Sequence, residues 1–247
     1  MKQLKERVVL AFFCLSVICV GGTQAIAEGI SKKQGDEILK ELKTIRTLLQ
    51  HNNNIVQQQK AVAIPEKVEV SINAGASLGK NDAPLVLVEF TDYQCPFCKR
   101  FYDNTFPELK KQYIDSGKLR FISRNLPLKF HKNAESAALA AACANDQNKY
   151  WKMRKFLFSD PNKLEPDNIT IYAKQSGLNM ESFNTCMTKR LHSQTIQKDI
   201  AAARAVGVSG TPSFVLAKND GDIVEGEKII GAQPFSILND KIQRLLK

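Results

Sequence analysis

Histidine is scarce in this chain of 247 residues, and its scarcity limits the metal chemistry available. The three histidines are His51, His131 and His192. A structural zinc site needs two ligand pairs at short spacing. Cys95 and Cys98 form one pair, but Cys143 and Cys186 lie too far apart in sequence to form a second. Haem attachment requires histidine directly after a C-x-x-C motif, where this chain has Lys99. We therefore expect neither a metal ion nor a cofactor.

The sequence also lacks a basic cluster interleaved with aromatic residues, which would indicate a nucleic-acid surface. Lys and Arg exceed Asp and Glu by 35 to 25, giving a formal net charge of +10. Because these charges are spread along the chain, they predict a solvated basic surface and no nucleic-acid partner.

The N-terminal apolar stretch Val8–Val20 is too short to span a bilayer comfortably. Lys2, Lys5 and Arg7 precede it, and an A-x-A sequence ends at Ala27. A basic start, a short apolar run and a small-residue site are typical of a signal peptide. We predict a signal peptide over residues 1–27, cleavage after Ala27 and export to the periplasm. An uncleaved membrane anchor is the alternative.

The Cys95-Pro96-Phe97-Cys98 motif lies between a predicted strand and a predicted helix. The strand is the apolar run Leu85–Phe90, and apolar residues at helical spacing predict a helix over Lys99–Tyr113. The start of a helix stabilises a thiolate, the form that attacks disulfides. The pattern therefore predicts a redox site with Cys95 as the more exposed nucleophile and Cys98 as the resolving thiol. An inert structural disulfide is the alternative.

A second motif, Gly210-Thr211-Pro212-Ser213-Phe214-Val215, lies far downstream. C-x-x-C after a strand, a long helical interval and this proline motif together resemble the thioredoxin superfamily, in particular bacterial DsbA-like thiol:disulfide oxidoreductases. The resemblance covers approximately residues 67–247. Without the C-x-x-C motif, Thr211-Pro212 would indicate only an ordinary turn.

The resemblance implies roles for several residues. Pro212 is expected in the cis form beside the cysteines, so that Thr211 and Pro212 form part of the substrate-docking face with Pro96 and Phe97. Glu89 is expected to be buried beneath the site and to exchange protons with Cys98. The alternative for Glu89 is an outward-facing surface carboxylate. Asp92 is expected to be a solvated loop residue.

Cleavage of the predicted signal peptide would remove Cys14 and Cys19. Besides the C-x-x-C pair, the mature chain would then contain Cys143 and Cys186. Because unpaired thiols are uncommon in exported proteins, we expect a structural Cys143–Cys186 disulfide. Two buried free cysteines are the alternative.

Apolar residues in segment 36–59 fall at alternating steps of four and three, as in the seam of a coiled coil. The seam residues are Ile38, Leu42, Ile45, Leu49 and Val56, with Asn52 in the same series. This pattern predicts a homo-oligomer, either a dimer or a larger assembly. The alternative is a helix packed against its own domain.

The predicted fold class is α/β: a thioredoxin fold with a helical insertion over approximately 131–207, preceded by an N-terminal amphipathic helix. The domains are 1–27, a helical segment and linker over 28–65, and the redox domain over 66–247. Strands are expected at 67–72, 118–124, 214–217 and 223–230, with a hairpin turn at 219–221 and a terminal helix at 234–246. Trp151, Phe156 and Phe158 are expected in the core of the insertion.

These features predict an exported enzyme that forms or rearranges disulfides in cysteine-containing client proteins and works with a membrane redox partner. The oligomerisation segment is consistent with isomerase or dual activity, and the alternative enzyme is an oligomeric isomerase or reductase kept reduced by a membrane electron donor. A chaperone-like holdase without redox activity is the non-enzymatic alternative.

Overall fold

The computed structural model describes residues 32–62 and 66–247, with side chains of helix α2 described as far as Gln50. The chain divides into two compact units at Ile64 and Pro65. The predicted signal peptide lies outside the described residues. Among the described helices, none combines the length and apolar character needed to cross a membrane.

The first unit contains a single described helix, α2 (Lys32–Val62). It begins before and ends after the predicted segment 36–59, and Gly35 lies inside it. The absence of proline between its ends permits one continuous helix, because no residue lacks the backbone N–H that the helix requires.

The second unit is built on a six-stranded mixed sheet with the strand order β1-β6-β5-β3-β4-β2. The strands are β1 (Lys67–Ser71), β2 (Ala76–Leu78), β3 (Leu85–Thr91), β4 (Leu119–Asn125), β5 (Ser213–Lys218) and β6 (Ile223–Ile230). Strand β3 pairs in parallel with β4 and antiparallel with β5, and every residue of β3 is buried. The predicted strands are confirmed within one or two residues. The sequence pattern does not predict β2, a three-residue edge strand.

The helix predicted over Lys99–Tyr113 is wrong as a single element. It divides into α3 (Pro96–Asn104), α4 (Phe106–Leu109) and a π-helical turn, η1 (Lys110–Ile114). Pro107 explains the break, because it cannot donate a backbone hydrogen bond and its ring would clash with the preceding helical turn.

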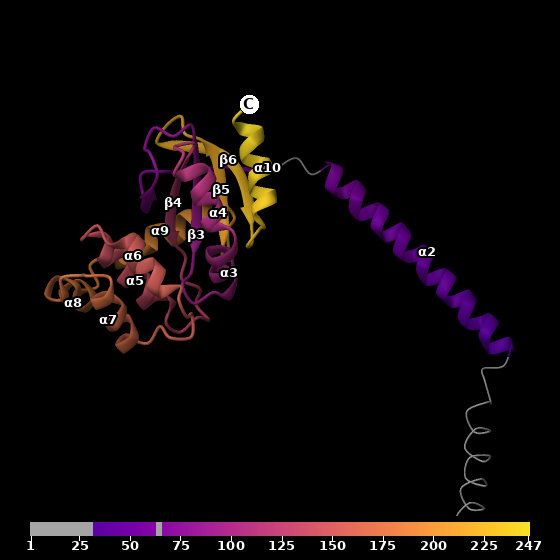
Figure 1. The fold of residues 1–247 in the computed structure, drawn as a ribbon, viewed down its shortest axis with the longest axis horizontal. Coiled ribbons are helices and arrows are strands. Elements are labelled where there is room, and N and C mark those ends of the chain that lie inside the picture. Colours follow the sequence, from indigo (N-terminus) through magenta and orange to yellow (C-terminus); the bar gives the residue numbers. More distant parts are fainter. Residues whose placement is uncertain (1–31, 63–65) are drawn as a thin grey trace, which may run out of the picture. The chain divides into compact units, whose positions relative to one another are not determined.

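Helices cover both faces of the sheet (Figure 1). On one face, Phe101 of α3, Leu109 of α4 and Leu238 of α10 (Phe235–Leu245) share a core with Leu87 and Leu216 of the sheet. On the other face, Ala203 of α9 (Ser193–Ala205) packs in a cluster with Val86, Val88 and Val215. The alternation of inward and outward residues along β3 thus supplies both cores, as expected for a strand covered on both sides.

The helical insertion forms a third core beyond the sheet. Four of its helices lie together in Figure 1: α5 (Ala134–Asn145), α6 (Tyr150–Leu157), α7 (Pro166–Gln175) and α8 (Met180–Lys189). The fifth, α9, contributes Ile196 to this core and also packs on the sheet. Phe158 is fully buried in this core, as predicted. Trp151 is only partly buried and packs against both the insertion core and the sheet core, so it joins the two.

Candidate active site

Cys95 is the residue immediately before helix α3, as its sequence position predicts. Its backbone is extended, with φ −75° and ψ 122°, and its carbonyl accepts a hydrogen bond from the Lys99 amide at 3.1 Å. Pro96 occupies the first helical position, where its missing N–H removes no hydrogen bond. The Cys95 sulfur therefore lies at the positive end of the helix dipole.

The two thiols are less accessible than the sequence suggests. Cys95 is 3% exposed and Cys98 is fully buried, and both are free thiols. By contrast, Phe97 between them is 52% exposed. Cys95 is thus only narrowly the more accessible residue of the cysteine pair, and Pro96 and Phe97 between them are the exposed residues of the motif.

The surroundings of the two thiols move their acidities in opposite directions. The hydrogen bond from the Cys98 thiol lowers the pKa of Cys95 to about 5 against the opposing effect of burial, and the nearby Thr211 side chain and the Phe97 and Cys98 amides lower it further. Burial, followed by the hydrogen bond and charge of Cys95, raises the pKa of Cys98 well above its ordinary value. Near neutral pH, the reduced pair therefore carries its negative charge on Cys95.

The proline motif lies directly beside Cys95. The Thr211–Pro212 peptide bond is cis. The Cys95 thiol donates a hydrogen bond to the Thr211 carbonyl, with Sγ and O 3.3 Å apart, across a separation of 116 residues. Thr211 and Pro212 are both buried and lie immediately before β5. The tertiary fold thus brings together the two motifs that carry the sequence resemblance.

Glu89 is completely buried in β3, so the alternative of a surface carboxylate is wrong. Its Oε2 lies 2.8 Å from Nη2 of Arg154 and accepts a hydrogen bond from the Ser123 hydroxyl at 3.1 Å. The charge of Glu89 is among the causes that raise the pKa of Cys98. Glu89 therefore acts electrostatically on the inner thiol, and we propose its proton-exchange role below.

Arg154 is the main feature of the site that sequence reasoning missed. It is fully buried, comes from α6 of the insertion and donates a hydrogen bond to Ser123 Oγ at 2.8 Å. Burial is the largest single effect on the pKa of Arg154 and lowers it, but the charge and hydrogen bond of Glu89 together with Tyr150 and Tyr93 raise it, so the net direction is upward. Five aromatic rings surround the guanidinium, with centroids 4.8–5.8 Å away: Tyr102, Phe106, Phe121, Trp151 and Phe158. The only sequence feature that could have indicated this buried arginine is its position within the aromatic segment 150–158.

The expectation that Asp92 is solvated is wrong. Asp92 is buried, and its carboxylate accepts hydrogen bonds from the Gln94 and Leu128 amides, both at 2.8 Å. The same carboxylate lies 2.8 Å from Nδ1 of His131, while the Asp92 amide donates to Cys98 Sγ at 3.5 Å. The backbone amides give the buried carboxylate the hydrogen bonds that water would otherwise provide. Asp92 therefore fixes the position of the loop around the inner thiol.

The basic residues that follow the motif are engaged elsewhere. Lys99 pairs with Asp103 at 2.7 Å, one turn along the helix. The Arg100 guanidinium lies over the Phe97 ring, 5.0 Å from its centroid. Hydrogen bonds to sulfur, rather than these two charges, account for the acidity of Cys95.

Cys143 of α5 and Cys186 of α8 form a disulfide. His192 lies close to both sulfurs, and its Nε2 is 2.7 Å from Asp146 Oδ2. A zinc ion needs free thiolates. Because the sulfurs are bonded to each other, these residues do not form a ligand set for a metal ion.

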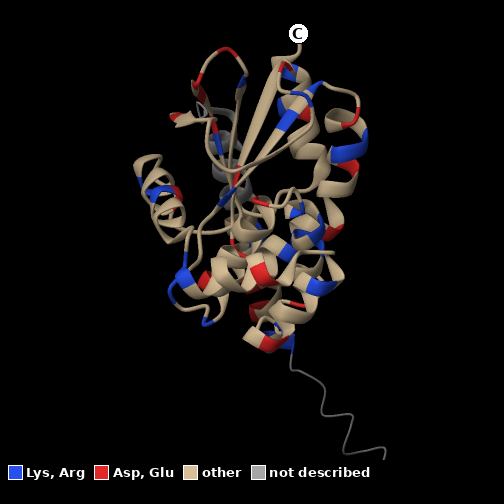
Figure 2. Cartoon of the chain, turned by 90° about the vertical axis from the view of Figure 1, so that its left-hand side faces the viewer, with Lys and Arg blue, Asp and Glu red and all other residues tan. Residues whose placement is uncertain are grey.

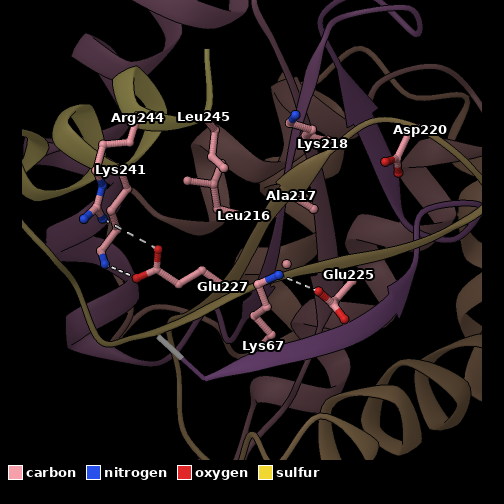
Figure 3. Close-up of a pocket in the computed structure, with 11 residues that line it drawn as sticks. Lys67, Leu216, Ala217, Lys218, Asp220, Glu225, Glu227, Lys241, Arg244 and Leu245 are labelled. Atoms are coloured by element: carbon pink, nitrogen blue, oxygen red, sulfur yellow. Dashed lines mark hydrogen bonds and ion pairs between the residues drawn. The ribbon is translucent and has the colours of Figure 1, made fainter. Parts of the chain in front are cut away.

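A cavity of about 450 Å³ lies at the β5–β6 hairpin and the end of α10, lined by residues outside both redox motifs (Figure 3). Its charged groups are largely paired: Lys67 with Glu225 at 2.7 Å, and Lys241 with Glu227. In Figure 2, basic and acidic residues are interspersed over the helices and strands. Neither the cavity nor the charge distribution indicates a second binding site besides the cysteine pair.

Comparison with known proteins agrees with this geometry. Residues 72–232 match the model of the thioredoxin family. A probable disulfide bond formation protein D of Bacillus anthracis is 30% identical over 152 residues, which cover 58% of this chain and 70% of that protein. The crystal structure of Wolbachia pipientis alpha-DsbA1 superposes with a TM-score of 0.62 and 26% identity, covering 71% of this chain and 92% of that one.

Other relatives carry the similarity as a small part of a larger protein. The Na(+)/H(+) antiporter NhaA 3 of Salinispora tropica is 32% identical over 137 residues, which cover 55% of this chain and 20% of the antiporter. The chain thus spans about a fifth of the length of the antiporters that it matches. The family-model match lies within the unit that holds both motifs, and the expected thioredoxin fold with its helical insertion is confirmed. The chain therefore belongs to the thioredoxin family and has a DsbA-like fold.

Proposed function

We propose that this chain is an exported thiol:disulfide oxidoreductase that forms or rearranges disulfides in client proteins. The observation that carries the proposal is the split acidity of the cysteine pair, with Cys95 ionised and Cys98 protonated beside the cis-proline turn. A stable outer thiolate and a protonated inner thiol are what exchange chemistry requires.

In the reducing direction, the Cys95 thiolate attacks one sulfur of a client disulfide. A Cys95–client disulfide forms, and the second client sulfur leaves as a thiolate. Cys98 then loses its proton and attacks Cys95, which releases the first client thiolate and leaves a Cys95–Cys98 disulfide. Glu89 accepts this proton and returns it in the reverse step, a role supported by its burial and by the effect of its charge on the Cys98 thiol.

In the oxidising direction, a client thiolate attacks Cys95 of the Cys95–Cys98 disulfide, and Cys98 leaves and is protonated. A second client thiolate then attacks the client sulfur of the mixed disulfide, so that Cys95 leaves as a thiolate. Its pKa of about 5 makes Cys95 a good leaving group. Stabilising the reduced form in this way makes the disulfide oxidising, which favours net oxidation of clients.

The docking face includes Phe97, which is exposed, and the Thr211–Pro212 turn beside Cys95. An apolar exposed side chain and a backbone edge suit an extended, unfolded client segment with cysteines. A membrane redox partner would restore the active state after each cycle. Export to the periplasm is supported by the N-terminal sequence pattern.

The exposed apolar stripe of α2 supports self-association and hence a second candidate activity, disulfide isomerisation. Assembled copies would present several cysteine pairs to one misfolded client, so that one site attacks while another holds it. The isomerase would need a membrane electron donor to keep Cys95–Cys98 reduced.

The first test traps thiols in the native compartment by acid quench and alkylation, followed by mass analysis. A mostly oxidised Cys95–Cys98 pair would support the oxidase. A mostly reduced pair beside an intact Cys143–Cys186 disulfide would support the isomerase or reductase.

The variant Cys95→Ser separates the enzyme from a holdase. We expect it to lose disulfide exchange with glutathione and with a model client. If exchange persists, Cys95 is not the nucleophile. If wild-type chain shows no exchange yet suppresses client aggregation equally with Cys95→Ser, the holdase is correct.

A further inference from the structure

Helix α2 presents a continuous apolar face in the range where its side chains are described. Six large apolar side chains there are 45–63% exposed: Ile38, Leu39, Leu42, Ile45, Leu48 and Leu49. Burying each of these aliphatic side chains against a partner would stabilise the helix, because apolar surface would be removed from water. The question is which partner covers this face.

The spacing of the central residues assigns them to heptad positions. In a heptad, d follows a by three residues and the next a follows d by four. Ile38 and Ile45 are therefore d positions, while Leu42 and Leu49 are a positions. Because this repeat matches the seam of a coiled coil, the partner that fits it is another copy of the same helix.

The residue types at these positions bear on the number of helices. Parallel dimers favour β-branched residues at a and leucine at d, whereas leucine at a with isoleucine at d favours trimers or tetramers. Helix α2 has the second arrangement at Leu42, Ile45 and Leu49, whereas the a position before Ile38 is Gly35. Leu39 at e and Leu48 at g widen the apolar face, as a helix with more than one neighbour requires.

Charges beside the seam bear on the direction of the helices. Glu41 is at a g position and Arg46 is at the e position of the following heptad. In a parallel, in-register bundle, g of one helix faces this e of its neighbour, so Glu41 meets Arg46. In an antiparallel bundle g faces g and e faces e, and no other e or g residue in the range 34–53 would give Glu41 or Arg46 an opposite charge. Among the described residues, neither forms an ion pair within its own chain.

We infer that α2 assembles three or four copies of this chain into a parallel, in-register coiled coil joined by Glu41–Arg46 pairs between neighbouring helices. This inference rests on the proposed self-association and specifies its number and direction. Parallel helices all end at the same end of the bundle, so the redox units of every copy follow from one end. The assembly therefore groups several cysteine pairs, as the proposed isomerase activity needs.

The number of helices is tested by sedimentation equilibrium and native mass spectrometry of the full chain. We expect the mass of three or four chains. The variant that exchanges the seam types (Ile38→Leu, Leu42→Ile, Ile45→Leu, Leu49→Ile) has the same composition and should fall to two chains. A wild-type dimer, or a seam-exchange variant of unchanged mass, would overturn the assigned number. A wild-type monomer would overturn self-association itself, and with it this inference.

The direction is tested with Glu41→Lys and Arg46→Glu. Each variant alone places like charges between neighbours and should raise the concentration for half-assembly about threefold. Each exposed pair contributes a factor of about two at each of three or four interfaces, and this concentration varies as the square or cube root of the assembly constant. Mixing the two restores opposite charges, so mixed assemblies should exceed the random proportion. A random proportion would overturn the parallel pairing.

Matched controls carry the same charge changes away from the seam. Glu37→Lys lies at a c position and Lys43→Glu at a b position. Both should assemble like wild type and mix randomly. If they weaken assembly as strongly as the seam variants, net charge explains the effect and the Glu41–Arg46 pairing is wrong.

Discussion

At the residue scale, the two cysteines differ in how well the protein stabilises their charged forms. Cys95 receives hydrogen bonds from the Cys98 thiol and from backbone amides, whereas Cys98 is buried and faces the charges of Cys95 and Glu89. One thiolate is favoured and the other opposed within a single helical turn. This asymmetry has measurable consequences for reactivity and for stability.

The alkylation rate of reduced Cys95 should rise with pH through a midpoint of about 5 and level off near neutrality, because only the thiolate reacts. Timed iodoacetamide labelling with mass detection measures it. In Cys98→Ala the midpoint should move upward, because the main stabilising hydrogen bond is gone. An unchanged midpoint in this variant would show that Cys98 does not set the acidity of Cys95.

The same lowered pKa should make the stability of the reduced chain depend on pH. The folded thiol ionises near pH 5 and the unfolded one near pH 8.5, so the contribution is complete above pH 8.5 and is lost as pH falls to 5. The gain is about 1.4 kcal/mol per pH unit between these limits. Denaturant unfolding of the reduced and oxidised chains measures it, since the oxidised pair has no thiol to titrate. A constant difference between the two forms would contradict the assignment.

Arg154→Met should lower the free energy of unfolding by about 3–5 kcal/mol, because it leaves Glu89 as a buried charge without its cationic partner. The double variant Glu89→Gln/Arg154→Met should recover most of the loss. Urea unfolding of the two single variants and the double variant forms the cycle. If the two single losses simply add, Glu89 and Arg154 do not act as a pair.

At the element scale, the Cys143–Cys186 disulfide joins α5 to α8 within the insertion, away from the cysteine motif in sequence. It spans 43 residues, and closing a loop of that length stabilises the folded state by about 4 kcal/mol in the chain-entropy model. Its contribution is therefore expected in stability rather than in exchange chemistry.

Cys143→Ala/Cys186→Ala should accordingly lower the free energy of unfolding by about 4 kcal/mol while the glutathione equilibrium of Cys95–Cys98 stays unchanged. Denaturation and a redox titration of the same preparation measure the two quantities. A shifted equilibrium would show that the insertion disulfide is coupled to the active site.

At the scale of the whole molecule, the chain combines two compact units that meet in sequence at Ile64 and Pro65. The second unit contains both redox motifs and its own cores, so it should fold independently. The first unit contributes α2, whose exposed apolar face is suited to assembly.

Deletion of residues 28–64 should therefore leave a folded monomer. Its melting temperature and its rate of exchange with glutathione should equal those of the redox unit in the full-length chain. Its isomerase activity on a scrambled multi-disulfide client should fall several-fold relative to its oxidase activity, because grouped sites are lost. Calorimetry, sedimentation and refolding assays measure these properties. Equal isomerase activity in the monomer would show that assembly does not serve isomerisation.

Features encoded by neighbouring residues were readable from the sequence. Strand β3, the helix that follows the cysteine motif and the heptad spacing of α2 all depend on side chains a few positions apart. Hydrophobic periodicity and helix-start chemistry are local, so the amino-acid order alone indicates them.

Features that depend on distant residues were decided only by the tertiary structure. Arg154 reaches Glu89 because the fold brings this residue of α6 beside β3, and Asp92 is buried because the Leu128 amide and His131 enclose it. A charged residue reads as exposed in a sequence, since burial is costly without a partner. The sequence by itself determined the cysteine motif and its helix. Only folding supplied the partners that bury Glu89, Arg154 and Asp92 around it, because those partners lie far away along the chain.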